Sequence, residues 1–291
     1  MREPSESSTK RRYAAAAFLT LLLLSVFWPS PIVSANRLWI NAELDIDELS
    51  FLGREDASWD VVFWCIAGLF LLAILQSADS LDFRGAWRRL REVRFARALW
   101  PPALLRLGIG ALVTALVWWR LDPLVLAWAE GVQSDAIEDV IRIFNRLGGG
   151  MNPVMLVAFF LVAGVAYVER RWISYAIAMA FAGLAAGLAA QIVKHLVGRA
   201  RPELWLGAMH YAPGSSTSFP SGHTVGAFAL CGVLIFASPS HTLRVIAFLI
   251  AASIGLSRIF AFRHWTSDVV ASAVIGLVMA WVATRATVTR A

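Results

Sequence analysis

Long apolar stretches alternate with short polar ones along most of the chain, and this pattern predicts eight hydrophobic helices. They cover Tyr13–Trp28, Val61–Gln76, Leu104–Trp119, Pro153–Val168, Trp172–Val193, Thr224–Ala237, Leu243–Phe260 and Trp265–Thr284. Because an α-helix rises about 1.5 Å per residue, about 20 residues are needed to cross a hydrocarbon core of about 30 Å. Several stretches are shorter than that, so we expect their helices to extend beyond these limits. The pattern predicts an all-α integral membrane protein.

The first apolar run, Tyr13–Trp28, follows the basic residues Lys10-Arg11-Arg12. It is either a transmembrane helix or the core of a secretory signal peptide, because Val33-Ser34-Ala35 has the small residues of a cleavage site. The run is long for a signal-peptide core, which favours the uncleaved helix. Both interpretations place the next segment outside the cytoplasm.

The polar connections differ in charge. The segment Asn36–Asp60 is acidic, and we interpret it as a solvated loop with one short amphipathic helix rather than a lid. The connection Arg84–Arg106 carries seven arginines. When eight spans are threaded alternately, this basic connection and both termini share one side, which the positive-inside rule makes cytoplasmic. Between two of the spans lies the polar excursion Leu121–Asn152, with an amphipathic stretch at Ala136–Leu147 and a break at Gly148-Gly149-Gly150.

Composition agrees with a membrane protein: of 291 residues 58% are hydrophobic and 16% charged, with a mean hydropathy of +0.65. The net charge of +6 would suit a nucleic-acid partner, but the basic residues form short runs between apolar segments, so we expect none. The two cysteines, Cys65 and Cys231, lie in apolar segments and are predicted to be buried thiols.

Three polar clusters interrupt the C-terminal apolar half, and alternate threading places all of them on the extracytoplasmic side. The first runs from Lys194 through Arg201 to Pro202. A lone Lys or Arg near a helix end is usually an interfacial residue whose charge reaches the headgroup layer. Lys194, Arg201 and Arg258 share one side, however, and together they indicate a site for an anion such as phosphate.

The second cluster, Pro220-Ser221-Gly222-His223, has the residues of a helix start. Since a helix N-terminus has free N–H groups, we expect Ser221 and Gly222 to present amides to an anion. An ordinary helix cap is the alternative for the tetrapeptide taken alone.

In the third cluster, His264 and Asp268 stand four residues apart, which places both on one face of a helix. A carboxylate on one imidazole nitrogen fixes the tautomer and makes the other nitrogen more nucleophilic. A structural His–Asp pair is the alternative. Two histidines and an aspartate can also bind zinc, but the neighbouring cations would repel a metal ion, so no metal is expected.

These residues resemble a known family signature. Lys194, Arg201 and Pro202, then residues 220–223, then Ser257, Arg258, His264 and Asp268 match the three-part motif of the type 2 phosphatidic acid phosphatases in order and spacing. That superfamily also contains bacterial acid phosphatases and vanadium haloperoxidases. The resemblance covers about residues 104–284. It implies a six-helix membrane phosphatase domain at 104–285, preceded at 1–103 by an extension with two predicted transmembrane helices and the basic cytoplasmic loop.

The resemblance also implies roles. His264 would be the nucleophile, Asp268 would orient it, and His223 would be the general acid. The phosphoryl oxygens would be held by five residues: Lys194, Arg201, Ser221, Gly222 and Arg258. The implied reaction is hydrolysis of a lipid phosphate or diphosphate through a phosphohistidine, without a metal or other cofactor.

Two alternatives remain at the level of sequence. A lipid phosphotransferase would use the same phosphohistidine with an acceptor other than water. A non-catalytic membrane transport or structural protein would have lost a signature residue, and none is lost here. The implied partners are membrane lipids, and the implied location is the bacterial inner membrane with the site facing the periplasm or exterior. The sequence does not indicate which lipid is the substrate or how many chains assemble.

Overall fold

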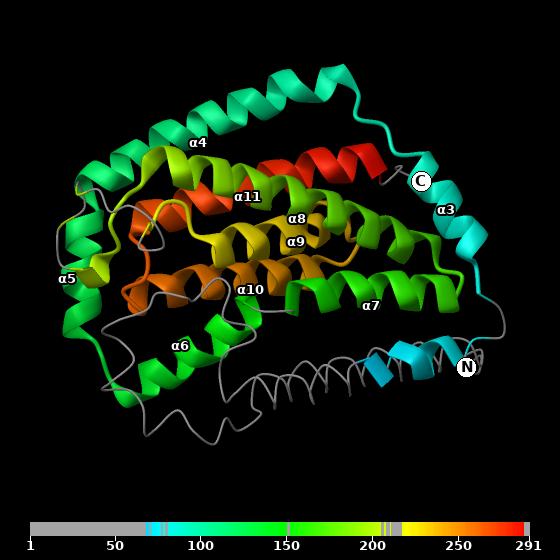
Figure 1. Cartoon of the computed structure of the whole chain (residues 1–291), viewed down its shortest axis with the longest axis horizontal. Coiled ribbons are helices and arrows are strands. Elements are labelled where there is room, and N and C mark those ends of the chain that lie inside the picture. The colour runs from blue at the N-terminus through cyan, green and yellow to red at the C-terminus, as the bar shows by residue number, and fades with distance from the viewer. Residues whose placement is uncertain are drawn as a thin grey trace.

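The computed structural model describes residues 68–69, 71–76, 78, 81–149, 152–204, 207, 210 and 217–287, and this part of the chain is an elongated bundle of helices (Figure 1). The predicted helix Tyr13–Trp28, the acidic segment Asn36–Asp60 and Cys65 lie outside the described residues. Of the predicted helix Val61–Gln76, residues 68–69 and 71–76 are described and are helical.

Each of the six apolar stretches predicted between residues 104 and 284 is a helix. They are α4 (Trp100–Arg120), α7 (Asn152–Ala166), α8 (Arg170–Val197), α9 (Gly222–Ala237), α10 (His241–Phe260) and α11 (Thr266–Thr287). Most are longer than the hydrophobicity pattern alone suggests, as their length in a bilayer requires. No strand occurs among the described residues, where the one β-bridge joins Ala200 to Thr217.

Helix α9 lies at the centre of the bundle and packs against α8, α10 and α11. The contact between α9 and α11 is close because glycines face it. A Cβ atom at Gly276 would lie 2.7 Å from the carbonyl oxygen of Val225, and one at Gly232 would lie 2.6 Å from the Cβ of Ala280. Small residues at this contact let the two backbones approach, as is common between membrane helices.

Four helices of the described chain are long and apolar enough to cross a membrane by themselves: residues 97–120, 170–197, 241–260 and 266–287. Helix α7 reaches that length only together with α6 (Asp135–Gly148), and the pair is bent by 52°. Helix α9 has 16 residues, about 24 Å of helix, and lies inside the bundle. The prediction of a full span for each apolar stretch therefore holds for four stretches individually.

Two helices were not expected from the hydrophobic pattern. Helix α3 (Phe83–Arg91) forms within the basic connection, where the carboxylate of Asp82 caps it by accepting from the N–H of Gly85 at 2.7 Å. Helix α5 (Asp122–Gly131) begins directly after α4. Helix α6 confirms the predicted amphipathic stretch, and Ser134 caps it by accepting from the N–H of Ile137.

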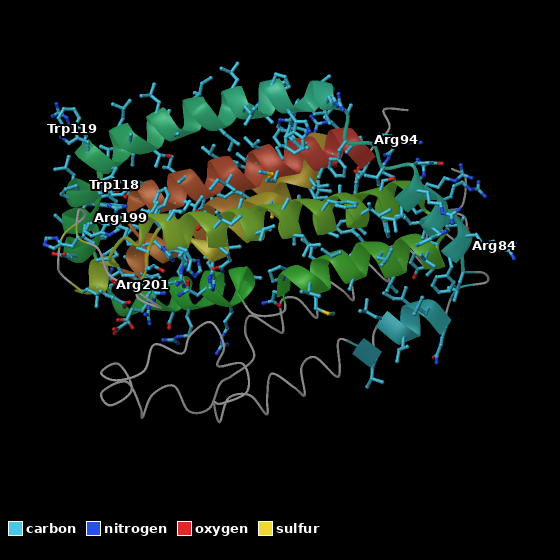
Figure 2. The ribbon with its side chains drawn as sticks, turned by 45° about the horizontal axis from the view of Figure 1, so that its top comes forward. Arg84, Arg94, Trp118, Trp119, Arg199 and Arg201 are labelled. Carbon is cyan, nitrogen blue, oxygen red and sulfur yellow. The ribbon has the colours of Figure 1, made fainter. Side chains whose placement is uncertain are left out.

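The charged residues divide between the two ends of the bundle (Figure 2). Arg84 and Arg94 lie at one end, and Arg199 and Arg201 lie at the other. Alternate threading of the chain requires this separation of the basic connection from the predicted site. Which end faces the cytoplasm stays a prediction. Cys231 is 8% exposed, which confirms the buried thiol predicted there.

Candidate active site

The first cluster spans the C-terminal end of α8 and the residues after it. Lys194 lies in the last turn and is buried, and Gly198 ends the helix with a positive φ of 57°, a conformation that suits glycine. The N–H of Gly198 donates to the carbonyl of Lys194 at 3.0 Å. The chain then turns across the end of the bundle, and the side chain of Arg201 is also buried.

The second cluster begins α9, as predicted, with Ser221 at the N-cap position. The N–H of Ser221 donates to the hydroxyl of Ser272 on α11 at 2.8 Å, so this amide is already satisfied within the protein. The expectation that it faces an anion is therefore wrong for the Ser221 amide. Gly222 differs, because a Cβ atom there would meet nothing within 4 Å, and that space lets a ligand approach the backbone.

His264 lies in the connection between α10 and α11 and is 3% exposed. Its Nδ1 lies 2.7 Å from the carbonyl oxygen of Ser218 and 3.6 Å from Oδ2 of Asp268. A carbonyl can only accept, so Nδ1 carries the proton and Nε2 carries the lone pair. The tautomer is the one a nucleophilic histidine needs. The Ser218 carbonyl is therefore the nearer partner of Nδ1, and the Asp268 carboxylate is the more distant one.

The environment of His264 also favours its neutral form. Burial is the main cause that lowers the pKa of the imidazole to about 4; the charges of Arg258 and Arg201 act in the same direction, and the interaction with Asp268 opposes the shift. At neutral pH the ring therefore has a free lone pair for attack on an electrophile.

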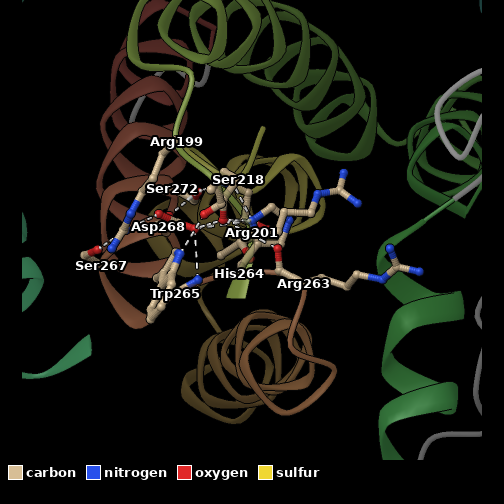
Figure 3. A network of polar contacts seen from close by, with 12 residues as sticks. Arg199, Arg201, Ser218, Arg263, His264, Trp265, Ser267, Asp268 and Ser272 are labelled. Carbon is tan, nitrogen blue, oxygen red and sulfur yellow. Dashed lines mark hydrogen bonds and ion pairs between the residues drawn. The ribbon is translucent and has the colours of Figure 1, made fainter. Parts of the chain in front are cut away.

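Asp268 is fully buried and organises the surrounding backbone (Figure 3). Its Oδ2 accepts from the N–H of Trp265 at 2.9 Å and from the hydroxyl of Ser218. Its Oδ1 accepts from the guanidinium of Arg199 at 2.6 Å. The carboxylate thus joins Trp265, the residue after His264, to the loop that supplies the Ser218 carbonyl.

Arg199 and Asp122 form a buried ion pair beside this network, and sequence reasoning gave neither a role. The Arg199 guanidinium donates to Oδ2 of Asp122 at 2.6 Å, and its centre lies 4.0 Å from the ring centroid of Trp118 and 4.9 Å from that of Trp265. Asp122 also accepts from the backbone N–H of Ser267 at 2.8 Å. The sequence did contain one signal for this pair: Asp122 directly follows an apolar helix, where an unpaired charge is costly and a buried partner is expected.

Arg258 is held by α6. Its guanidinium donates to Oδ1 of Asn145 at 2.8 Å, and the hydroxyl of Ser257 donates to the same oxygen at 3.2 Å. The glycine break after α6 approaches His223: a Cβ atom at Gly149 would lie 2.6 Å from its Nε2. Neither Asn145 nor this function of the break was predicted, because no motif marks a contact between residues this far apart in sequence.

The structure brings the predicted charged groups together. Lys194, Arg201, Arg258 and His264 all lie close enough to His223 to act on its charge. Two other histidines lie apart from these contacts: Nδ1 of His195 contacts the carbonyl of Gln191 at 2.7 Å and the side chain is exposed, and His241 begins α10 at the opposite end of the bundle. Two imidazoles with different neighbours, surrounded by three cations, can transfer a phosphoryl group.

Comparison with known proteins identifies the same part of the chain as the candidate active site. Residues 171–291 match the PAP2 superfamily, and that segment contains all three clusters. The structure of the first transmembrane PAP2-type phosphatidylglycerolphosphate phosphatase from Bacillus subtilis superimposes with a TM-score of 0.53 at 20% identity, over 63% of this chain and 94% of that one. This likeness shows the membrane PAP2 fold.

Two curated relatives match over shorter segments. The lipid A 1-phosphatase of Rhizobium johnstonii is 39% identical over 98 residues, which is 31% of this chain and 38% of that protein. Lipid phosphate phosphatase 2 of Arabidopsis thaliana is 29% identical over 133 residues, 34% of this chain and 46% of that protein. The chain thus spans less than half the length of each of these relatives.

Proposed function

Because the C-terminal part of this chain, residues 171–291, belongs to the PAP2 superfamily, we propose that the protein is a membrane enzyme that hydrolyses a lipid phosphate or diphosphate. The observation that carries the proposal is the buried His264, whose Nδ1 contacts the Ser218 carbonyl at 2.7 Å while three cations lie around the same centre. Such an arrangement presents a neutral nucleophile to an anionic substrate at the end of an apolar bundle.

In the proposed first step, Nε2 of His264 attacks phosphorus. An N–P bond forms and the P–O bond to the lipid breaks, while His223 gives its proton to the leaving oxygen. In the second step water attacks the phosphohistidine and His223 takes a proton from that water. The N–P bond then breaks, and inorganic phosphate leaves with His264 restored.

The cations would stabilise the transition state. Lys194, Arg201 and Arg258 would hold the equatorial oxygens, on which charge is concentrated in phosphoryl transfer. The Asn145 contact at 2.8 Å would keep the Arg258 guanidinium in place. Gly222 and the hydroxyl of Ser221 would complete the oxygen contacts. The scheme uses no metal ion.

For the substrate, we propose a phosphorylated lipid of a bacterial membrane. The names of the similar proteins suggest lipid A 1-phosphate and phosphatidylglycerol phosphate first. Phosphatidic acid and polyprenyl diphosphate have the same reacting group. We propose the inner membrane as the location, with the site at the periplasmic or outer face, because the arginine-rich end would then lie in the cytoplasm.

The test is phosphate release by the purified full-length protein in detergent from each of these four lipids, with and without a chelator of divalent metals. We expect release from at least one lipid, unchanged by the chelator and abolished by His264→Ala. The matched control is His241→Ala, which removes a histidine at the opposite end of the bundle and should retain the wild-type rate.

The intermediate has its own readout. With substrate labelled in the phosphoryl group, His264 should become transiently labelled through a bond that is stable to alkali and labile to acid. Label that passes to a second lipid rather than to free phosphate would show a phosphotransferase. If no lipid is hydrolysed, or if His264→Ala retains full activity, the proposal is wrong.

A further inference from the structure

The end of the bundle opposite the candidate active site contains a second cation-rich hollow. It is a pocket of about 840 Å³ formed by the α7–α8 turn, the α9–α10 turn, the C-terminal part of α11 and residues of α3 and α4. Figure 1 shows the start of α8 and the end of α11 together at this end. Among the described residues that line it are six arginines: Arg89, Arg106, Arg170, Arg171, Arg244 and Arg285.

The charge of this pocket is unbalanced, even with Arg89 paired to Glu92 at 3.4 Å. Glu169 is the one carboxylate among its described lining residues. Like charges around a single hollow repel one another, and an anion held between them removes that repulsion. Arginine has the planar donor geometry that pairs with phosphate oxygens. The pocket therefore has the charge and the donors to bind a phosphoryl group.

Several of the guanidinium groups are positioned by the protein itself. Nε of Arg244 donates to the carbonyl of Ser238 at 2.6 Å, and a nitrogen of Arg106 donates to the carbonyl of Pro102 at 2.8 Å. The guanidinium centres of Arg106 and Arg285 lie 4.2 Å and 5.6 Å from the ring centroid of Trp281. The positive-inside rule explains why arginines lie at this end of the bundle, but it does not require them to line one pocket.

The surroundings favour a lipid over a free anion. Phe236, Leu277 and Val278 form apolar parts of the pocket wall. On α4, Ile109 and Val113 follow Arg106 at helical spacing and are 56% and 44% exposed. An acyl chain can lie along this outward face while its head group reaches the arginines. A soluble phosphate would contact the arginines but would not contact the exposed apolar side chains of α4.

We propose that this arginine pocket binds the phosphoryl head group of an anionic phospholipid in the membrane leaflet opposite the candidate active site. Basic pockets between membrane helices are suited to such head groups. The site is separate from the catalytic centre and uses none of its residues. Its occupation would stabilise the folded bundle, because a ligand that binds only the folded state raises the melting temperature.

The test is thermal melting of the purified full chain in detergent during titration with short-chain phosphatidylglycerol. The pocket variant is Arg171→Gln with Arg285→Gln; in the described structure neither side chain has a hydrogen bond or ion pair to lose, and Arg285 loses its contact with the Trp281 ring. At about fivefold per arginine, we expect the double variant to bind roughly 25-fold more weakly. The matched control is Arg84→Gln with Arg88→Gln, which removes two charges at the same end without altering the pocket lining.

The outcomes separate the possible sources of the anion. Retained binding in the control and weakened binding in the pocket variant would support the proposal. An equal loss of phosphatidylglycerol binding in both variants would show that diffuse surface charge binds the lipid, and it would overturn the proposal. Inorganic phosphate that binds as tightly, with the same sensitivity to the pocket variant, would also overturn it, as would a wild-type protein that melts identically with phosphatidylglycerol and with phosphatidylcholine.

Two further controls keep the result interpretable. If the double variant does not accumulate, each single variant is expected to bind about fivefold more weakly. Release of phosphate from a detergent-dispersed lipid by the pocket variant should equal that of the wild type. Loss of lipid binding with intact hydrolysis would show that the pocket acts independently of catalysis. Absent hydrolysis in every variant and in the wild type would contradict the proposed catalytic function and would leave the binding result to be judged by itself.

Discussion

Gly149 and His223 come from distant parts of the chain and nearly touch at the candidate active site. A Cβ atom at Gly149 would lie 2.6 Å from Nε2 of His223, the end of a side chain that can swing aside. We expect Gly149→Ala to displace the proposed general acid and to lower kcat by about 10²-fold, with little change in melting temperature.

The control for this prediction is Gly131→Ala. Gly131 is the last residue of α5, and a Cβ atom there would meet nothing within 4 Å. Phosphate release by the two purified variants measures the difference. Equal rates would show that the glycine break does not position His223.

A second residue-scale prediction concerns the protonation of His264. Burial lowers its folded-state pKa to about 4, below the ordinary value of about 6.5, so the ring stays neutral until the pH falls through about 4. Since the unfolded chain takes up this proton near pH 6.5, the group also makes the folded state less stable as pH falls from about 6.5 to about 4.

The measurement is NMR of the protein labelled with ¹³C-histidine in detergent, with the His264 signal assigned by its loss in His264→Gln. We expect no titration of that signal between pH 7 and pH 5.5. A midpoint near 6.5 would contradict the prediction, because about a quarter of the imidazole would then be charged at pH 7.

Arg199 gives a prediction of stability. Its guanidinium is 2.6 Å from both Asp122 and Asp268, and all three side chains are buried. We expect Arg199→Gln to destabilise the fold by about 3–5 kcal/mol, because two buried carboxylates lose their partner. The control is Arg263→Gln, since Arg263 pairs with Glu203 at 2.9 Å near the surface and should cost at most about 1 kcal/mol. Similar melting temperatures for the two variants would contradict the assigned importance of the buried pair.

At the scale of the helices, α9, which contains His223, packs closely against α11, which begins two residues after His264. The nearest atoms to a Cβ at Gly276 would be the Val225 carbonyl oxygen at 2.7 Å and the Ala229 nitrogen at 2.8 Å, which are backbone atoms of α9. Backbone cannot rotate aside, so Gly276→Ala must separate the helices. We expect a loss of about 1–3 kcal/mol and a lower melting temperature in detergent.

Gly187→Ala is the comparison for Gly276→Ala. Gly187 lies in α8, and a Cβ atom there would meet nothing within 4 Å. Alanine is the better helix former by about 1 kcal/mol, so this variant should melt at the wild-type temperature or above it. If both variants melt alike, the close approach of α9 and α11 does not limit stability.

The helices differ in how far their sequence predicts them. Helices α8, α10 and α11 are long apolar runs, and hydrophobicity alone locates them within a few residues. Helix α3 is amphipathic and rich in arginine, so a search for apolar spans passes over it. The short helix α5 continues the apolar pattern of α4, and only the turn at Leu121 separates the two.

The residues of the candidate site also differ in how far the sequence predicts them. Lys194, His223 and His264 stand at spacings that a motif can identify. The Ser218 carbonyl and the Asn145 amide have no such signal, because they contact His264 and Arg258 across 46 and 113 residues of chain. Contacts of this kind depend on how helices pack, and packing was not predictable from the order of residues alone.

At the scale of the whole molecule, the two cation-rich ends give the bundle a direction. The candidate active site lies at the C-terminal end of α10, and the arginine pocket includes Arg244 near its N-terminal end. A helix of 20 residues is about 30 Å long, so it separates the two ends by about the thickness of a hydrocarbon core. We predict that the arginine end is cytoplasmic because short cytoplasmic loops retain basic residues.

Two exposed positions test this orientation in cells. Ala136 lies three residues after Gln133, whose side chain donates to the carbonyl of Phe260 at the end of α10, and Thr242 lies at the start of α10. In a chain with Cys65→Ser and Cys231→Ala, we expect Ala136→Cys to react with a membrane-impermeant thiol reagent in intact cells. Thr242→Cys should react only after lysis. The reverse pattern would place the candidate active site in the cytoplasm, where a lipid phosphate of the outer leaflet could not reach it.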